Sequence, residues 1–449
     1  MKSKTVNMLS GSITKGLLSM TIPIMIMNVM QSLFNVTDMT VLRFFSDDKA
    51  VGAVGACGSL IVLCTSLLIG ISAGANVVVA RRVGSGDKVQ SDRAVMTALL
   101  FSIIGGLVLA FIGATFAETF LKMTNCPIGL LPQATKYFKI YFYGVPIMML
   151  YNFCASILRA IGDTKRPMYF LIIGGIVKAL LTVLFVSVLN VDVEGVALAT
   201  IISNILACGL SLFTLLKLQN IVNVNLKEIK IDFTELKAML HIGIPAGLQS
   251  ALYSLANVVI TTAVNGFGEA ATTGIAIANQ FDGILYQISY APSLAVAPYV
   301  AQNMGAGNIK RIKKTLISAV LITTAFGATF GSLSAIFSKE LSLIMSSNPT
   351  VIEFSCQKMI IISSTYFICG INDVFGGTLR GMGKPIIPTV ATFVYMCVLR
   401  FVWVYAIFPL YPNLTFLYTV WPIGWTLSII TLLITYFMAM SKLEKKKAI

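Results

Sequence analysis

Apolar stretches long enough to cross a lipid bilayer as helices follow one another along nearly the whole chain, separated by short polar segments. A spanning helix needs about 20 apolar residues for the roughly 30 Å hydrocarbon core. Of the 449 residues, 57% are hydrophobic and only 11% are charged, whereas a soluble chain carries about 25% charged residues. No stretch shows the strict alternation of an outer-membrane barrel strand. These features predict an all-α integral membrane protein.

The apolar stretches predict about twelve transmembrane helices. They cover residues 16–42, 51–80, 94–117, 136–158, 167–190, 194–217, 238–265, 270–302, 315–338, 354–379, 386–409 and 416–440. The side of the membrane that holds the N-terminus carries 24 Lys and Arg residues, and the opposite side carries seven. This asymmetry predicts a multi-pass protein of the plasma membrane with both termini in the cytoplasm. The seven are Arg43, Lys49, Lys122, Lys136, Lys139, Lys339 and Lys358.

An internal repeat divides the chain into two copies of one unit. Similar segments recur 221 residues apart, with one residue of slippage for the first proline. The pairs are 84–87 with 305–308, 158–162 with 379–383, Pro167 with Pro388, and Pro23 with Pro245. Each copy contains six predicted helices, an even number, so both copies begin on the same side and are parallel repeats.

The repeat predicts an N-terminal six-helix lobe at residues 1–218 and a C-terminal lobe at residues 238–449. The polar segment 219–237 interrupts the apolar pattern and is predicted to be a cytoplasmic linker. Two such lobes are expected to face each other across a central cavity, because transporter sites lie at the interface of such repeats.

Five ionisable residues lie deep within predicted spans. A charge at the bilayer centre costs at least about 2.5 to 3.5 kcal/mol on insertion scales, so each is a functional hypothesis. They are Asp38, Lys178, Asp282, Asp373 and Arg400.

The first predicted helix places Asn35 and Asp38 on one face, because they are three residues apart. A carboxylate at this depth is able to bind a proton or Na⁺ and to exchange it for a cationic substrate. The alternative is an acidic residue at the outer end of the helix that meets water. The residues that the repeat places opposite Asp38, Val259 or Ile260, carry no carboxylate, so the two lobes are predicted to differ chemically.

The eighth predicted helix has a polar and aromatic flank around Asp282. Carboxylates and aromatic faces both attract flat organic cations, so this flank suits the wall of a substrate cavity. Helix packing through polar contacts is the alternative. The residues predicted for the cavity are Gln249, Asn257, Gln280, Asp282, Tyr286, Asp373 and Arg400.

The remaining deep charges are predicted to pair with one another. Asp373 is either a second protonatable site or a structural partner of Arg400, and the structural role is favoured because an unpaired buried arginine is costly. Lys178 lies about eleven residues into its helix, where a carboxylate partner is a better prediction than snorkelling to the interface.

The sequence lacks the motifs of common nucleotide-hydrolysing and other catalytic sites. It contains no Walker loop, no HExxH zinc motif and no nucleophile with its base, so nucleotide hydrolysis and enzymatic catalysis have no support. Most of the eight cysteines lie in apolar stretches without CxxC spacing, so no structural metal site or disulfide framework is predicted. The net charge of +15 reflects membrane orientation and predicts no nucleic-acid partner.

Several of these segments resemble the multidrug and toxic compound extrusion family along nearly the whole chain. The segments are 22–38, 80–87, 158–163, 243–250, 302–308 and 379–383. The resemblance implies a monomeric secondary exporter that expels cationic or amphipathic small molecules against H⁺ or Na⁺ by alternating access, without another cofactor. Asp38 matches the family's first-helix carboxylate, a possible Na⁺ ligand, and Thr200 matches a nearby threonine.

The sequence departs from the family where the family often has Asn and Asp in the fifth helix, because it has Lys178 and Thr182 there. This departure predicts that Lys178 acts as a tethered cation paired with Asp38. Two alternatives to the exporter stay open. One is a flippase of lipid-linked oligosaccharides from the same wider superfamily, whose anionic substrate would favour a cationic cavity, and the other is a channel or a non-transporting receptor.

Overall fold

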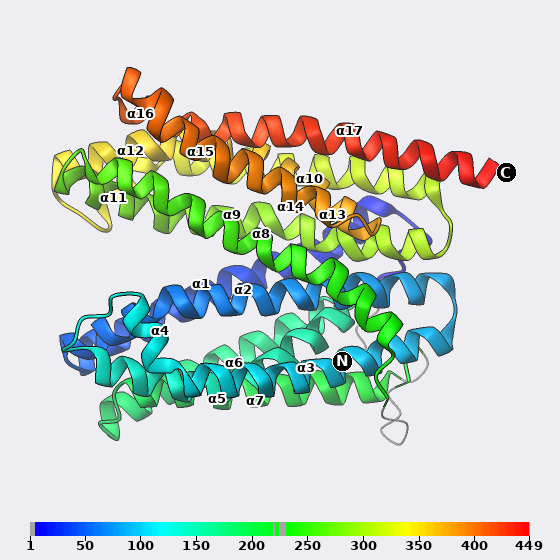
Figure 1. Cartoon of the computed structure of the whole chain (residues 1–449), viewed down its shortest axis with the longest axis horizontal. Helices are drawn as coiled ribbons and strands as arrows, with labels where there is room; N and C mark the ends of the chain where they lie inside the picture. Colours follow the sequence, from blue (N-terminus) through cyan, green and yellow to red (C-terminus); the bar gives the residue numbers. More distant parts are fainter. Residues whose placement is uncertain (1–4, 219–220, 224–229, 449) are drawn as a thin grey trace. The chain divides into compact units, whose positions relative to one another are not determined.

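The computed structural model of the chain describes residues 5–218, 221–223 and 230–448. Every regular element in these ranges is a helix (Figure 1). Ten helices there are long and apolar enough to cross a membrane, or eleven if the bent pair α12 (Pro349–Ser364) and α13 (Tyr366–Gly381) forms one span. The prediction of an all-α membrane protein is confirmed.

Each of the twelve predicted spans corresponds to one helix or to one run of consecutive helices. The span missing from the ten or eleven is α9 (Glu269–Gly305), which has 37 residues and therefore ample length. It carries Asp282 together with a series of amide and hydroxyl side chains. Its polarity, and not its length, therefore distinguishes α9 from the other long helices.

Unit 1 of the structure consists of residues 1–6 and 26–247. Its centre is α5, which packs against α2, α3 and α7, while α6 packs against α7. Glycines allow this close packing: a Cβ on Gly106 of α3 would come within 2.6 Å of the Cα of Pro146 in α5. The helices are α1 (Ile13–Phe45), α2 (Asp48–Ser85), α3 (Lys88–Thr115), α4 (Ala117–Met123), α5 (Leu131–Ala160), α6 (Lys165–Val183) with the π-helical η1 (Leu184–Val188), α7 (Val193–Lys217) and α8 (Phe233–Asn265).

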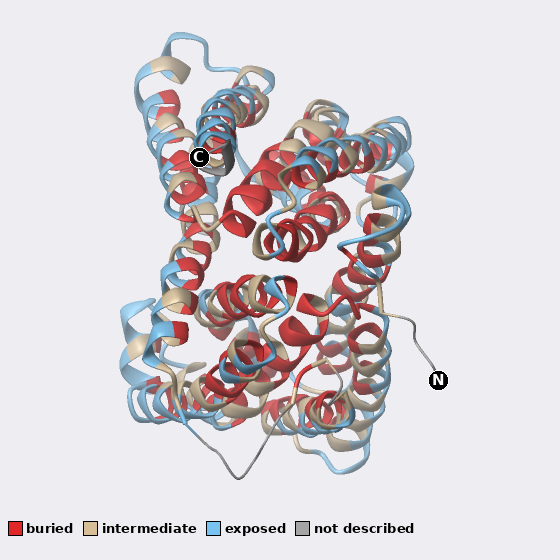
Figure 2. Cartoon of the chain, turned by 90° about the vertical axis from the view of Figure 1, so that its right-hand side faces the viewer, coloured by how far each residue is buried: buried red, intermediate tan, exposed pale blue. Residues whose placement is uncertain are grey.

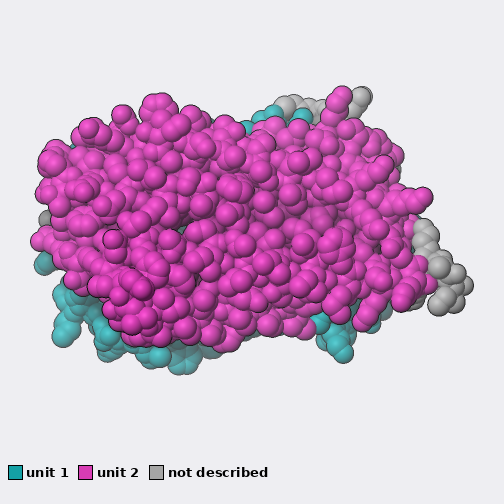
Figure 3. All heavy atoms as spheres, turned by 90° about the horizontal axis from the view of Figure 1, so that it is seen from above, with its two compact units in different colours: residues 1–6, 26–247 teal, residues 7–25, 248–449 magenta. Residues whose placement is uncertain are grey.

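Unit 2 consists of residues 7–25 and 248–449 (Figure 3). Its centre is α9, which packs against α10, α12 and α13, and α17 packs against α13. A broken helix at residues 386–410 alternates between α-helical and π-helical turns. The further elements are α10 (Ile309–Ile336), α11 (Ser338–Leu343), α14 (Ile386–Thr392), η2 (Phe393–Val398), α15 (Leu399–Val402), η3 (Trp403–Ile407), η4 (Phe408–Leu410), α16 (Leu414–Tyr418) and α17 (Val420–Ala448).

Two helices are each divided between the units. The division falls three residues after Pro23 in α1 and three residues after Pro245 in α8. The predicted lobes at 1–218 and 238–449 follow the helix count and stay a prediction; the compact units are separated inside these two helices instead. Of the predicted linker, residues 219–220 and 224–229 lie outside the described residues.

The repeated Gly-rich segments are turns between helices. Gly86 has a φ of +75° and ends α2, and the Asp87 side chain then accepts a hydrogen bond from the N–H of Gln90 at the start of α3. In the second copy, Gly307 has a φ of +67° and Asn308 caps α10. Glycine tolerates this left-handed conformation, and Asp and Asn are good N-cap residues. The repeated segments therefore form the same kind of turn in both copies.

Burial follows the packing within each unit. Buried residues lie on the sides of helices that face other helices, while exposed residues cover the outer sides and the connecting loops (Figure 2). Large apolar side chains such as Phe111 and Leu180 are 71% and 66% exposed. Exposed apolar surface of this kind is what a lipid environment requires. It therefore agrees with membrane insertion.

Candidate functional site

A buried ion pair joins α1 and α6 in unit 1. The Nζ atom of Lys178 lies 2.6 Å from Oδ2 of Asp38, and both side chains are 12% exposed. The predicted contact between these residues is therefore present. In a low-dielectric environment each charge needs the other, because removing either partner leaves an uncompensated ion.

The second carboxylate oxygen of Asp38 is also contacted from α6. Thr182, one helical turn after Lys178, donates a hydrogen bond of 3.4 Å from Oγ1 to Oδ1 of Asp38. Residues four apart share a helix face, which is why both partners come from α6. Gly175, on the same helix, leaves room for the ring of Phe34, since a Cβ there would collide with that ring. This glycine allows α1 to approach α6.

One further predicted ion-coupling residue, Thr200, forms no hydrogen bond with this cluster among the described residues. Thr200 donates its hydroxyl proton to the carbonyl of Val196 in its own helix, at 2.9 Å, and no hydrogen bond between Thr200 and Asp38 is present among the described residues. The side chain of Asn35 lies outside the described residues. Within the described ranges, no group of three or more His, Cys, Asp or Glu side chains is arranged to hold a metal ion.

Tyrosines of α5 complete the surroundings of Asp38. Tyr137 and Tyr141 both lie close enough to the Asp38 carboxylate to interact with it electrostatically. Their ring centres are 6.2 Å apart, as expected for neighbours one turn apart on a helix. The sequence analysis missed them, although two tyrosines four residues apart inside an apolar span are a recognisable signal.

Unit 2 holds a second buried ion pair, between α9 and α12. Nζ of Lys358 lies 2.7 Å from Oδ2 of Asp282, and the two side chains are 3% and 11% exposed. Lys358 also donates a hydrogen bond to Oδ1 of Asn279. The other carboxylate oxygen of Asp282 is buried and has no hydrogen-bond partner among the described residues.

The placement of Lys358 corrects the sequence analysis, which counted it with the basic residues of the outer side. α12 begins at Pro349, where Asn348 caps it, five residues before the predicted start of the span. Lys358 therefore lies more than two turns inside the helix and is buried. The deep charges now comprise three acidic and three basic residues, because Lys358 joins the five predicted ones.

Arg400 is stabilised by an amide and an aromatic ring, and not by Asp373 as predicted. Its Nη1 atom donates to Oδ1 of Asn257 at 2.7 Å, and its guanidinium carbon lies 4.8 Å from the ring centre of Trp421. Lys358 Nζ lies 6.0 Å from the same ring centre. No ion pair between Arg400 and Asp373 is present among the described residues. Two cations thus share the face of one indole, which attracts positive charge.

Asp373 belongs to a polar cluster nearer the end of α13. Asn372 donates to Oδ1 of Asp373 at 3.5 Å. Arg380 donates to Oε1 of Gln249 at 2.9 Å and to Oγ of Ser293 at 3.2 Å. Gln249 is therefore a structural partner of Arg380 in this conformation.

The last predicted cavity residues lie along α9. Gln280 is exposed, whereas Tyr286 is half-buried and stacks on Tyr290 with ring centres 5.4 Å apart. Tyr366 donates a hydrogen bond of 3.1 Å to the backbone carbonyl of Asp282, which ties α13 to α9. The structure thus brings Asp282 together with Lys358 and Asn279, and leaves Gln280 outside this cluster.

The two units carry their deep cations at similar positions of the sequence repeat. Lys178 and Arg400 are 222 residues apart, as are Asn35 and Asn257. The spacing equals that between the two prolines of α1 and α8. Pro167 and Pro388, near the start of the fifth helix of each copy, are 221 residues apart, so the two cations lie within one residue of equivalent positions, while their counter-groups differ.

Comparison with known proteins gives agreeing results. The model of the MatE family matches residues 23–184 and 245–406. The probable multidrug resistance protein YoeA of Bacillus subtilis is 28% identical over 378 residues, covering 82% of this chain and 81% of YoeA. The FAD transporter of Shewanella oneidensis is 25% identical over 387 residues, 84% of each chain. A solved structure described as an outward-facing multidrug resistance MATE family transporter of the MOP superfamily has a TM-score of 0.91 at 18% identity, over 99% of this chain and 100% of that one; this likeness shows a shared fold.

Proposed function

This chain belongs to the MatE family of multidrug and toxic compound extrusion proteins, and from that membership we propose that it exports cationic or amphipathic small molecules in exchange for protons. The family and the structural neighbour are transporters and not enzymes. A relative named as a multidrug resistance protein supports a multidrug exporter. The proposal places the protein in the plasma membrane with both termini in the cytoplasm, acting as a monomer and without a further cofactor.

The observation that carries the proposal is the ion pair between Asp38 and Lys178. An ionised Asp38 holds the ammonium group of Lys178, while a protonated Asp38 leaves it without a counter-charge in a low-dielectric environment. That state is costly, so protonation favours another arrangement of α1 and α6. A ligand that has different affinities for two arrangements shifts their populations. Proton binding at Asp38 thereby drives the conformational cycle.

The same pair favours H⁺ over Na⁺ as the coupling ion. Lys178 already occupies the position beside Oδ2 that a bound cation would take, and Thr182 occupies Oδ1. A Na⁺ ion at this carboxylate would stand close to the ammonium group, and like charges repel strongly at such distances in a low dielectric. A proton adds to the carboxylate without requiring that space.

Efflux of ethidium from cells stripped of their own pumps tests this function. We expect an inward proton gradient to drive efflux by the wild type, and an inward Na⁺ gradient alone to fail. Asp38→Asn should lose gradient-driven efflux at equal membrane expression. Lys178→Asn keeps the Asp38 carboxylate but removes the ammonium group beside it. Efflux by this variant should therefore become responsive to Na⁺. Undiminished proton-driven efflux by Asp38→Asn, or an unchanged ion dependence of Lys178→Asn, would overturn the coupling proposal.

A second candidate function is export of anionic organic molecules. Lys358 neutralises Asp282, and both Lys358 and Arg400 lie at the face of Trp421. With three acidic and three basic deep residues, the charge balance no longer favours cations. One relative is named as a transporter of FAD, an anionic aromatic molecule. Retention of ethidium together with gradient-driven export of a fluorescent flavin nucleotide would favour this candidate.

A further inference from the structure

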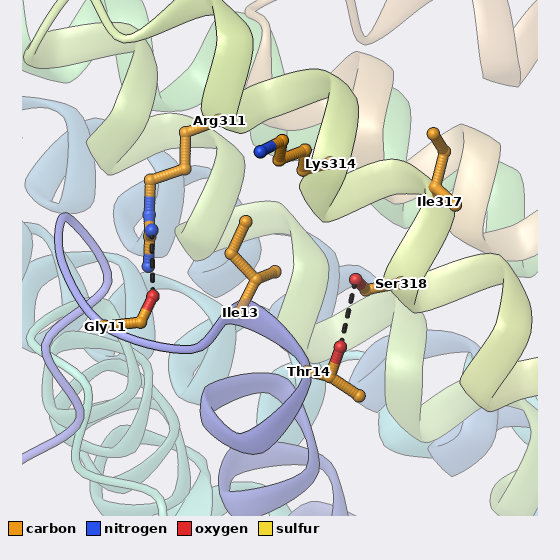
Figure 4. Close-up of a pocket in the computed structure, with 7 residues that line it drawn as sticks. All are labelled: Gly11, Ile13, Thr14, Arg311, Lys314, Ile317 and Ser318. Atoms are coloured by element: carbon orange, nitrogen blue, oxygen red, sulfur yellow. Dashed lines mark hydrogen bonds between the residues drawn. The ribbon is translucent and has the colours of Figure 1, made fainter.

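A pocket with a volume of about 370 Å³ opens where the beginning of α1 meets the beginning of α10, both in unit 2 (Figure 4). This volume falls within the range of about 300 to 1,000 Å³ that small-molecule sites usually have. Its side chains are of three kinds and, within the described part of the chain, include no carboxylate. They are the cations Arg311 and Lys314, the hydroxyl residues Thr14 and Ser318, and the apolar Ile13 and Ile317.

Arg311 builds one wall of the pocket by holding the segment that precedes α1. Its guanidinium donates to the carbonyls of Met8 at 2.8 Å, Ser10 at 2.7 Å and Gly11 at 3.0 Å. Asn303 adds a hydrogen bond of 3.1 Å to the carbonyl of Met8. These carbonyls fix the position of the guanidinium, but they carry no net charge. The positive charge of Arg311 is therefore available to an anion.

Lys314 supplies a second positive charge one turn further along α10. It is exposed, and it forms no ion pair or hydrogen bond with any residue that the structure describes. Figure 4 shows its ammonium group directed toward the side of the pocket where Arg311 lies. On the opposite side, the hydroxyls of Thr14 and Ser318 are hydrogen-bonded to each other at 3.3 Å. Together these groups form a polar rim with excess positive charge.

An apolar ridge leads from this rim along α10. Ile317 lines the pocket and is 60% exposed, and Leu321, one turn further into the span, is 65% exposed. Residues four apart lie on one face of a helix, so the ridge continues directly from Lys314 toward the bilayer interior. A ligand that fits both parts has an anionic head and an apolar tail.

We infer that this pocket binds the phosphate headgroup of an anionic glycerophospholipid. Lys314 and Arg311 face the phosphate, the hydroxyl pair of Thr14 and Ser318 contacts its oxygens, and an acyl chain lies along Ile317. Basic pockets between transmembrane helices at the membrane surface bind such headgroups. The bound lipid joins the beginning of α1 to α10, so it stabilises the attachment of residues 7–25 to unit 2.

Native mass spectrometry of the purified full-length protein in detergent tests this inference. We expect phosphatidylglycerol to bind in preference to phosphatidylcholine, and Lys314→Gln to bind phosphatidylglycerol about fivefold more weakly, as expected for one lost surface cation. Lys88→Gln is the matched control, because Lys88 begins α3 after the equivalent Gly-rich turn and its loss changes the net charge equally. Its phosphatidylglycerol binding should equal that of the wild type.

Three outcomes overturn the inference. Equal losses in Lys314→Gln and Lys88→Gln would indicate non-specific attraction by net charge. Equal binding of the two lipids would show that the headgroup charge is not recognised. Displacement of the lipid by an equimolar amount of soluble glycerol phosphate, together with unchanged lipid binding by Ile317→Ser, would assign the pocket to a free phosphate ligand. The proposed transport function is unaffected by any of these results.

Discussion

The two units carry a cation within one residue of equivalent positions of the repeat but surround it differently. In unit 1 Lys178 pairs with the carboxylate of Asp38. In unit 2 Arg400 donates to the amide of Asn257 and lies against the ring of Trp421. A compact ammonium group depends on a counter-ion, whereas a planar guanidinium is stabilised by a neutral oxygen and an aromatic face together.

This difference bears on the proposed coupling mechanism. In that mechanism, protonation of Asp38 removes its charge and weakens the contact in unit 1, whereas no proton binds to the amide of Asn257 near neutral pH. The equivalent contact in unit 2 is therefore insensitive to protons. Unit 2 instead places its ion pair on α9 and α12, through Asp282 and Lys358.

The largest loss of stability is expected when Lys358 is replaced. Lys358→Met leaves Asp282 charged in a site where the lysine was only 3% exposed, so we expect a loss of about 3 to 5 kcal/mol in stability. The apparent melting temperature in detergent measures this loss. The double variant Lys358→Met/Asp282→Asn should recover most of it. A double variant no more stable than Lys358→Met would show that the ion pair is not the cause.

Lys178→Met is the matched change in unit 1, and its effect should be smaller. Both side chains there are 12% exposed, and Thr182 still donates a hydrogen bond to Asp38. An unpaired Asp38 should therefore destabilise the protein less than an unpaired Asp282. We expect a loss of about 3 kcal/mol, the lower end of the range for broken buried pairs. Melting temperatures of the two lysine variants, measured side by side, decide the order. A greater loss for Lys178→Met would reverse our ranking of the two sites.

The contact between α1 and α6 in unit 1 differs in side-chain size from the corresponding contact in unit 2. Unit 1 has Phe34 and Gly175 at the positions where unit 2 has Ala256 and Cys397. Gly175→Cys should therefore clash with the Phe34 ring and cost about 1 to 3 kcal/mol.

The double variant Phe34→Ala/Gly175→Cys reproduces the pair of unit 2. A double-mutant cycle of melting temperatures should show that the two changes compensate each other. Purely additive losses would contradict the proposed exchange of a large and a small side chain.

The smallest loss of stability is expected for changes of Trp421, whose ring lies against both Arg400 and Lys358. Trp421→Phe keeps an aromatic face but weakens the attraction to Arg400 and Lys358, so we expect a loss of about 0.5 to 1 kcal/mol. Trp421→Leu removes the face and should lose more. Identical melting temperatures of these two variants would show that the ring contributes through packing alone.

The helices were predictable from the sequence because a membrane imposes one length and one polarity on every span. The breaks and π-helical turns within the helices could not be predicted in the same way. The break at Thr365 lies at no proline or glycine, and although Pro388 and Pro409 flank the π-helical turns of η2 and η3, a proline does not specify which kind of turn replaces the α-helix. The division of α1 and α8 between the units was also missed, because the prolines indicate a bend but not which helices each half contacts.

The contact between Asp38 and Lys178 was predictable because the family resemblance places the position of Lys178 in the fifth helix beside the carboxylate of the first helix. The site was missed at Lys358, which lies near the start of its predicted span and was counted with the outer side, because the helix begins five residues earlier than predicted. The predicted pairing of Asp373 with Arg400 was wrong because a single sequence gives the rotation of a helix only loosely. Arg400 contacts α8 and α17 instead, and neither contact follows from the spacing of charges.

The division of α1 also has a consequence for the order of events during synthesis. Residues 7–25 are synthesised well before the rest of unit 2, and the carbonyls of Met8, Ser10 and Gly11 are bound by Arg311, which is made some 300 residues later. Until then this segment lacks its hydrogen bonds to Arg311. Release of a nascent chain before Arg311 would therefore leave an intact-looking first half whose opening segment is exposed to membrane quality-control proteases.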